Sequence, residues 1–107
     1  MKFLVSTRPI EGIEKRLPRP QDFEAQIEWI RQQLDSGRID CAYHGENHAV
    51  AIVNAESREE LEQLYGTMPL IELAERQVEA LGSLFDQVQG VLEGLRKYHL
   101  RRVERTT

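Results

Sequence analysis

Residues 39–54, with the sequence IDCAYHGENHAVAIVN, decide the fold of this chain. The stretches Ile39–Gly45 and His48–Asn54 have the pattern of extended strands, and the short polar connection Glu46-Asn47 joins them. Two strands joined this closely predict a β-hairpin, so the chain is expected to contain antiparallel sheet. The segments before and after the hairpin indicate which kind of sheet protein this is.

Amphipathic helices are predicted on both sides of the hairpin. Before it, apolar residues recur every three or four positions from Asp22 onward, and Gly37 ends the pattern. After it, Ser57 stands three residues before Glu60, the spacing of a capping box at a helix start. The apolar positions are Phe23, Ile27, Ile30 and Leu34 in the first helix and Leu61, Leu64, Tyr65 and Met68 in the second.

The two ends of the chain supply further elements. Lys2–Thr7 predicts a strand, and the prolines and glycine between residues 9 and 20 predict an irregular connection after it. Residues 70–81 favour a helix by intrinsic propensity, although tertiary contacts can make such a sequence a strand. A long C-terminal helix is predicted over about residues 83–104. Its apolar positions are Leu84, Phe85, Val88, Leu92, Leu95 and Tyr98.

With residues 70–81 taken as a strand, the order of elements is βαββαβ followed by a helix. This order predicts the α+β class: a ferredoxin-like domain with an antiparallel sheet and an extra C-terminal helix, spanning residues 1–107. The sheet of such a domain carries helices on one face only. Because the other face needs cover, we expect a homodimer or a larger homo-oligomer.

Composition narrows the classes of partner. The 107 residues carry a net charge of −4, which argues against a general nucleic-acid binder. No apolar run is long enough for a membrane span, and the single cysteine, Cys41, has no intrachain disulfide partner. We therefore expect a cytoplasmic protein with neither nucleic acid nor membrane as a partner.

Several short segments between Leu34 and Leu84 give the chain a family resemblance. They are the helix end at residues 33–37, Gly45 in the hairpin, the alternating strand His48–Val53, the helix start Ala55-Glu56-Ser57, and Met68-Pro69-Leu70 ahead of the last strand. With these segments the sequence resembles the muconolactone isomerase-like branch of the dimeric α+β barrel superfamily. It departs from that pattern where Ile71-Glu72 stands in place of a second proline.

The resemblance implies a homodimer whose sheets face one another, with a pocket between each sheet and its own helices. Enzymes of this family isomerise a small unsaturated lactone carboxylate without a metal or an organic cofactor. The reaction removes a proton from a carbon conjugated with a carbonyl and returns it elsewhere. It needs one group that exchanges a proton near neutral pH and donors for the developing oxyanion.

Candidate catalytic residues lie around the hairpin. His48 is the first choice of acid/base and His44 the second, because imidazole titrates close to neutral pH. Tyr43 is a candidate hydrogen-bond donor. If residues 44 and 48 pair, both histidines share a face; if the register shifts by one, His48 joins Tyr43. No spacing of His, Cys, Asp and Glu in this region is typical of a metal site, so no metal is predicted.

Candidate substrate-binding residues come from the other elements. Arg8, at the end of the first strand, is suited to hold a substrate carboxylate. Trp29 and Tyr65 belong to the helices expected to cover the pocket side of the sheet. Each of these residues also has a purely structural interpretation, since histidines near turns and aromatics at helical spacing are common without a functional role.

Two other functions are compatible with the same sequence. One is a cofactor-free monooxygenase acting on an aromatic substrate with this fold. The other is a non-catalytic ligand-binding or assembly protein that uses its long C-terminal helix as an interface. Fold alone does not decide among these functions.

Overall fold

A computed structural model describes residues 1–12 and 17–106 of the chain. The elements follow the predicted βαββαβ order with a C-terminal helix. They are β1 (Lys2–Pro9), α1 (Pro20–Asp35), β2 (Ile39–His44), β3 (Ala49–Asn54), α2 (Arg58–Tyr65), the short 3₁₀ helix η2 (Ile71–Leu73), β4 (Ala74–Leu81) and α3 (Leu84–Thr106). The predicted α+β class and ferredoxin-like order are confirmed.

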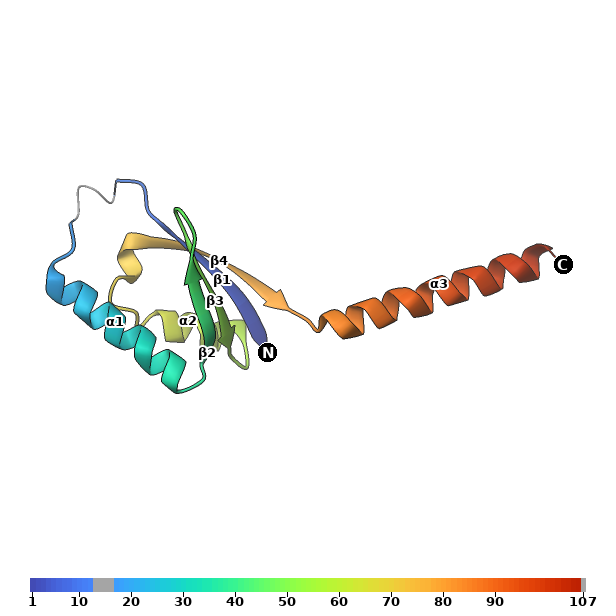
Figure 1. Cartoon of the computed structure of the whole chain (residues 1–107), viewed down its shortest axis with the longest axis horizontal. Helices are drawn as coiled ribbons and strands as arrows, with labels where there is room; N and C mark the ends of the chain where they lie inside the picture. Colours follow the sequence, from blue (N-terminus) through green and yellow to red (C-terminus); the bar gives the residue numbers. More distant parts are fainter. Residues whose placement is uncertain (13–16, 107) are drawn as a thin grey trace.

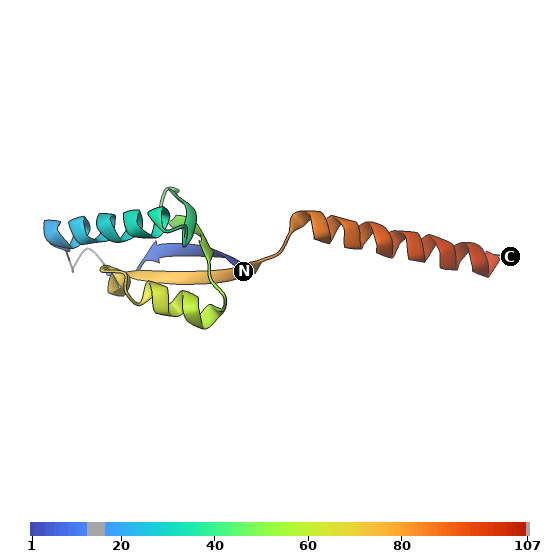
Figure 2. The same cartoon turned by 90° about the horizontal axis from the view of Figure 1, so that it is seen from below.

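The four strands form one antiparallel sheet with the order β2-β3-β1-β4. Helices α1 and α2 lie side by side on the same face of this sheet, as the two views in Figures 1 and 2 show. We call the other face the outer face of the sheet. This two-layer arrangement is what a split βαβ topology produces, because each helix crosses over the same side of the sheet.

Local signals fix the ends of the helices. Pro20 occupies the first turn of α1, where its missing N–H group costs no helical hydrogen bond. Gly37 follows the helix with a φ of 77°, a left-handed conformation that glycine adopts without steric cost. In α2, the Oγ of Ser57 accepts a hydrogen bond of 3.1 Å from the backbone N–H of Glu60. The predicted start of this helix is therefore confirmed.

The segment over residues 70–81 is a strand preceded by one 3₁₀ turn. Every residue of β4, from Ala74 to Leu81, has a partner on β1 in the antiparallel register. Pairing along this full length satisfies backbone groups that a helix would satisfy internally, so the tertiary context overrides helix propensity. Within the expected irregular connection of residues 9–20, positions 13–16 lie outside the described residues.

The hydrophobic core lies between the sheet and the two helices. Phe3, Val5 and Val53 reach it from the strands, and Leu61 and Tyr65 reach it from α2. Leu61 and Val53 have no exposed surface. The remaining buried members of this cluster are Trp29, Ile39, Ala55 and Met68.

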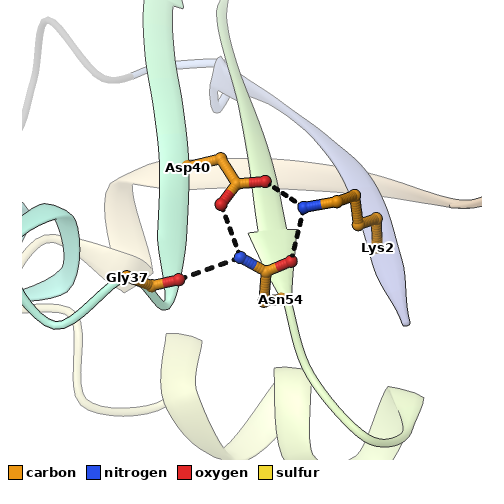
Figure 3. Close-up of polar contacts among 4 residues, drawn as sticks. All are labelled: Lys2, Gly37, Asp40 and Asn54. Atoms are coloured by element: carbon orange, nitrogen blue, oxygen red, sulfur yellow. Dashed lines mark hydrogen bonds and ion pairs between the residues drawn. The ribbon is translucent and has the colours of Figure 1, made fainter.

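A polar network closes one end of the sheet on its outer face (Figure 3). The ammonium group of Lys2 contacts the carboxylate of Asp40 and donates a hydrogen bond of 2.9 Å to Oδ1 of Asn54. The amide of Asn54 donates to Asp40 at 2.6 Å and to the carbonyl of Gly37 at 2.9 Å. The hydrogen bonds from Lys2 and Asn54 lower the pKa of Asp40 below its ordinary value of 3.8.

Helix α3 extends away from the rest of the molecule (Figures 1 and 2). Every residue from Gly82 to Arg101 is exposed. The molecule measures 74 × 31 × 23 Å, and its radius of gyration is 20.5 Å, against about 13 Å for a compact chain of this length. A helix was predicted over about residues 83–104, and this range in the sequence is confirmed. The helix packs against neither the sheet nor the layer of α1 and α2.

Candidate functional site

A cavity of about 640 Å³ opens between α1 and the helix-facing side of the sheet. Its floor carries three alanines of the hairpin, Ala42, Ala49 and Ala51, whose small side chains leave the space beneath α1 unfilled. Trp29 of α1 and Tyr65 of α2 form part of its wall. A volume of this size suits a small organic molecule with one or two rings.

The aromatic wall of the cavity is held in place by contacts behind it. The rings of Trp29 and Tyr65 lie 5.6 Å apart with an angle of 57° between their planes. The indole N–H of Trp29 donates a 2.8 Å hydrogen bond to Oγ1 of Thr67, which itself donates to the carbonyl of Leu64 at 2.6 Å. The indole group is therefore satisfied within the protein and presents an apolar surface to the cavity.

A charged pair lies behind Tyr65. The guanidinium of Arg76 lies 5.3 Å from the centre of the Tyr65 ring and forms a 2.7 Å ion pair with Glu62. Burial raises the pKa of the Tyr65 phenol to about 12, and the positive charge of Arg76 only partly offsets this effect. At neutral pH the phenol keeps its proton, so this wall residue is a hydrogen-bond donor rather than a base.

Polar and charged side chains gather at one rim of the cavity. The register of β1 and β3 ends with Thr7 opposite Ala49, so Arg8 and His48 are the next residues at this end of the sheet. Both line the cavity, together with Glu46 and Asn47 of the hairpin loop. The site thus combines an apolar interior with a cation, a carboxylate, an amide and an imidazole at its mouth.

The two predicted histidines occupy different parts of the hairpin, and the expectation that His48 joins Tyr43 in the shifted register is wrong because His48 lies in the loop rather than in the paired strands. His44 pairs with Ala49 and Tyr43 with Val50. Relative to a pairing of residue 44 with residue 48, this register is shifted by one residue, which is the second of the two predicted registers. Four residues, 45–48, therefore form the loop, and His48 lines the cavity. His44 is exposed, with Nδ1 3.2 Å from the carbonyl oxygen of Gly45.

The six predicted site residues fall into two groups. Arg8, Trp29, Tyr65 and His48 all line the cavity. Tyr43 lies on the outer face of the sheet, with 70% of its surface exposed, and neither it nor His44 is among the lining residues. Whether any of the six acts on a substrate stays a prediction.

Other lining residues were not recognised in the sequence. Glu46 and Asn47 carry polar groups at the rim, but in the sequence they have the pattern of ordinary turn residues. Gln26 also lines the cavity, and its side chain accepts a 3.2 Å hydrogen bond from the backbone N–H of Leu70. Only the tertiary structure brings α1 and the segment after α2 together here, so no local signal identifies this residue.

The described part of the chain contains neither a metal-binding cluster nor a helix suited to cross a membrane. Among the described side chains, those of residues 1–12 and 17–101, no three His, Cys, Asp or Glu gather as a metal site requires. In the same residues, no helix has the length and apolar content needed to cross a bilayer.

Comparisons with known proteins bear on the fold. No protein-family model and no curated protein sequence matches this chain. Among solved structures, the chain is similar to 5-chloro-2-hydroxyhydroquinone dehydrochlorinase from Burkholderia phenoliruptrix, in complex with 2,5-dihydroxybenzoquinone. The TM-score is 0.58 at 18% sequence identity, over 77% of this chain and 94% of that chain.

This chain has a ferredoxin-like α+β fold. The similarity to the dehydrochlorinase extends over nearly all of that enzyme, so it covers the complete domain rather than one motif. At this sequence identity the likeness is one of fold, and function has to be argued from the cavity itself.

Proposed function

We propose that this protein is a cofactor-free enzyme that moves a proton on a small, oxygenated ring compound bound in the cavity. The observation that carries the proposal is the cavity of about 640 Å³, apolar inside, with Arg8, Glu46 and His48 at one rim. An apolar interior with a few converging polar groups is the usual form of a small-molecule site. The reaction we favour is an isomerisation of the muconolactone isomerase type.

The proposed reaction begins with His48 as the general base. Its imidazole removes a proton from a ring carbon conjugated with the lactone carbonyl, and the electron pair moves onto the carbonyl oxygen as a dienolate. The imidazolium, whose N–H protons exchange with solvent, then donates a proton to a carbon of the conjugated system; donation to a different carbon moves the double bond. The reaction has no net gain or loss of atoms or electrons, so it needs no co-reactant.

The other rim and wall residues have supporting roles in this proposal. Arg8 holds the substrate carboxylate at the mouth by charge-assisted hydrogen bonds. Trp29 and Tyr65 enclose the ring, and the protonated phenol of Tyr65 is available to the developing oxyanion. His44 is the alternative base, and Tyr43 the alternative donor, should the hairpin reorganise when the substrate binds.

The structural neighbour supports the class of substrate. By its name that enzyme acts on a chlorinated hydroxyhydroquinone, and its structure holds 2,5-dihydroxybenzoquinone. Such compounds are, like muconolactone, small planar rings with several oxygens. A wall of two aromatic residues with charged groups at one rim suits either ring, so a hydroxyhydroquinone is the second substrate to test.

A homodimer completes the proposed enzyme. On the outer face of the sheet, two cross-strand rows of largely apolar side chains lie beside one another, all of them half-buried except the exposed Tyr43. One row holds Cys41, Ile52 and Leu4, and the other holds Tyr43, Val50 and Ser6. An equivalent face of a second copy would bury both rows and remove their apolar side chains from water.

Proton NMR of muconolactone in deuterated buffer tests the proposed chemistry. The intact protein is expected to accelerate deuterium uptake at the ring carbon, with or without complete isomerisation. His48→Gln should lower that rate by at least about a hundredfold, the usual contribution of a general acid/base. His99→Gln, on the exposed helix α3, should leave the rate unchanged and serves as the off-site control.

The outcomes of these experiments distinguish a wrong choice of base from a wrong proposed function. His44→Gln changes the same residue type in the same hairpin, outside the cavity lining. Loss of exchange in His44→Gln with normal exchange in His48→Gln would give the role of base to His44. If neither muconolactone nor hydroxyhydroquinone reacts faster with the intact protein than in buffer alone, the proposed function is wrong.

A further inference from the structure

Helix α3 carries an apolar stripe that none of the described residues covers. Leu84, Val88, Val91, Leu95 and Tyr98 follow one another at spacings of four and three residues, which places them on one side of a helix. Phe85 and Leu92, seven residues apart, widen this stripe. All seven side chains are between 45% and 72% exposed. We call these seven residues the α3 stripe.

A helix whose apolar stripe is exposed to water is not expected to be stable by itself. The stability of most protein helices comes from packing of an amphipathic face rather than from intrinsic propensity. Gly90 and Gly94 lie inside α3, and each lowers the stability of the helix relative to alanine. The helix therefore needs a partner surface along the α3 stripe.

Charge along α3 indicates what that partner is. Between Leu84 and Glu93 the helix carries two acidic residues, Asp86 and Glu93, and no basic one. Between residues 94 and 101 it carries three basic residues, Arg96, Lys97 and Arg101, and no acidic one. A second α3 lying antiparallel matches the acidic half of one helix with the basic half of the other. A parallel pair would instead bring the like-charged halves together.

We propose that α3 is a self-association helix, whose α3 stripe packs antiparallel against the α3 of a second copy of this chain. The stripe spans residues 84–98, so its midpoint lies at Val91 and two copies meet there. In this arrangement the aliphatic residues of one stripe cover those of the other, and the helix dipoles oppose one another. The inference does not depend on the proposed enzymatic activity.

Cysteine cross-linking tests both the pairing and its direction. In a Cys41→Ser background, single variants Leu84→Cys and Tyr98→Cys each place one thiol at an end of the α3 stripe. In an antiparallel pair, residue 84 of one copy lies opposite residue 98 of the other, whereas the two copies of residue 84 are about 21 Å apart at 1.5 Å per residue. A disulfide needs its Cα atoms within about 7 Å.

The antiparallel arrangement gives a specific pattern of products. Either variant alone should stay monomeric on a non-reducing gel after mild oxidation, whereas the two variants co-expressed should give a cross-linked dimer. Cross-linking of each variant alone would show a parallel pair and overturn the proposal. The absence of cross-linking in every sample would also overturn the proposal. The same holds if the samples do not cross-link and α3 instead binds phosphatidylglycerol vesicles.

A matched pair of charge substitutions identifies the surface responsible. Leu95→Glu places a charge within the α3 stripe, and Gln89→Glu adds the same charge outside it. In the co-expressed cysteine pair, Leu95→Glu should reduce the cross-linked product at least tenfold and lower the helical circular dichroism signal. Gln89→Glu should leave both unchanged. Equal yields in the two variants would overturn the assignment of the α3 stripe as the interface.

Discussion

The imidazole ring of His48 lies directly against the backbone of Gly45. A Cβ atom at position 45 would lie 2.5 Å from Cε1 and 3.0 Å from Nδ1 of that ring. The backbone N–H of Gly45 also donates a 2.7 Å hydrogen bond to the carbonyl oxygen of His48, which closes the hairpin loop. The absence of a side chain at Gly45 therefore lets the proposed base lie where it does, at the rim of the cavity.

Gly45→Ala is expected to displace the His48 ring without removing it. The proton-exchange rate should then fall by about ten- to a hundredfold, because a general base works only within hydrogen-bond reach of its proton. The measurement is the deuterium-uptake assay, with unfolding curves to show that the fold is kept. Gly94→Ala, where a Cβ meets nothing within 4 Å, is the matched control. Equal rates in the two variants would argue against His48 as the base.

Trp29 is the only tryptophan and lines the cavity, so its fluorescence reports occupancy. Titration with 2,5-dihydroxybenzoquinone should quench its emission in a saturable way. Ala42→Leu fills part of the cavity floor and should weaken this binding at least tenfold. Ala80→Leu makes the same change on the same sheet outside the cavity and should bind normally. Non-saturable quenching, equal in both variants, would mean that the cavity does not bind the ring.

Alkaline pH should destabilise the protein through Tyr65. Its phenol has a pKa of about 12 when folded and about 10 when unfolded, so the folded state keeps its proton while the unfolded state loses it. Stability should thus decrease as the pH rises between these two values. Tyr65→Phe should remove this part of the decrease in urea unfolding experiments, with the exposed-tyrosine variant Tyr98→Phe for comparison. If the free energy of unfolding of Tyr65→Phe decreases with pH as steeply as that of the unchanged protein, Tyr65 is not the source of the decrease.

Acid should remove the stabilisation that comes from Asp40. The pKa of this carboxyl is lower in the folded protein, so its contribution is complete above the ordinary value of 3.8 and is lost as the pH falls through the folded pKa. A double-mutant cycle of Lys2→Gln and Asp40→Asn measures it. The coupling between the two positions should be present at neutral pH and vanish in strong acid. A coupling that is independent of pH would show that the ion pair is not its source.

The order of elements was accessible from the sequence because its signals are local. The Ser57 cap, the glycine after α1 and the alternating residues of β3 each act over a few positions. The β4 segment was ambiguous for the opposite reason. Its strand conformation depends on pairing with β1, more than sixty residues away in the sequence, and local propensity carries no information about that partner.

The candidate site was predictable only in part. Arg8, Trp29, Tyr65 and His48 were selected by residue type and approximate position, and the cavity brings these four together. The rim residues Glu46 and Asn47 were missed, since a polar hairpin loop has an obvious structural role. The cavity itself has no sequence signal, because it results from small side chains on β2 and β3 facing a helix that packs above them.

The sequence by itself determined the α+β class, the hairpin, the helix starts and the amphipathic C-terminal helix, since each depends on neighbouring residues. The tertiary structure decided which histidine lines the cavity. His44 pairs with Ala49 inside the ladder, whereas His48 belongs to the four-residue loop, where strand alternation does not fix the direction of its side chain. The conformation of that loop depends on its packing at the end of the sheet, and no local stretch of sequence encodes it.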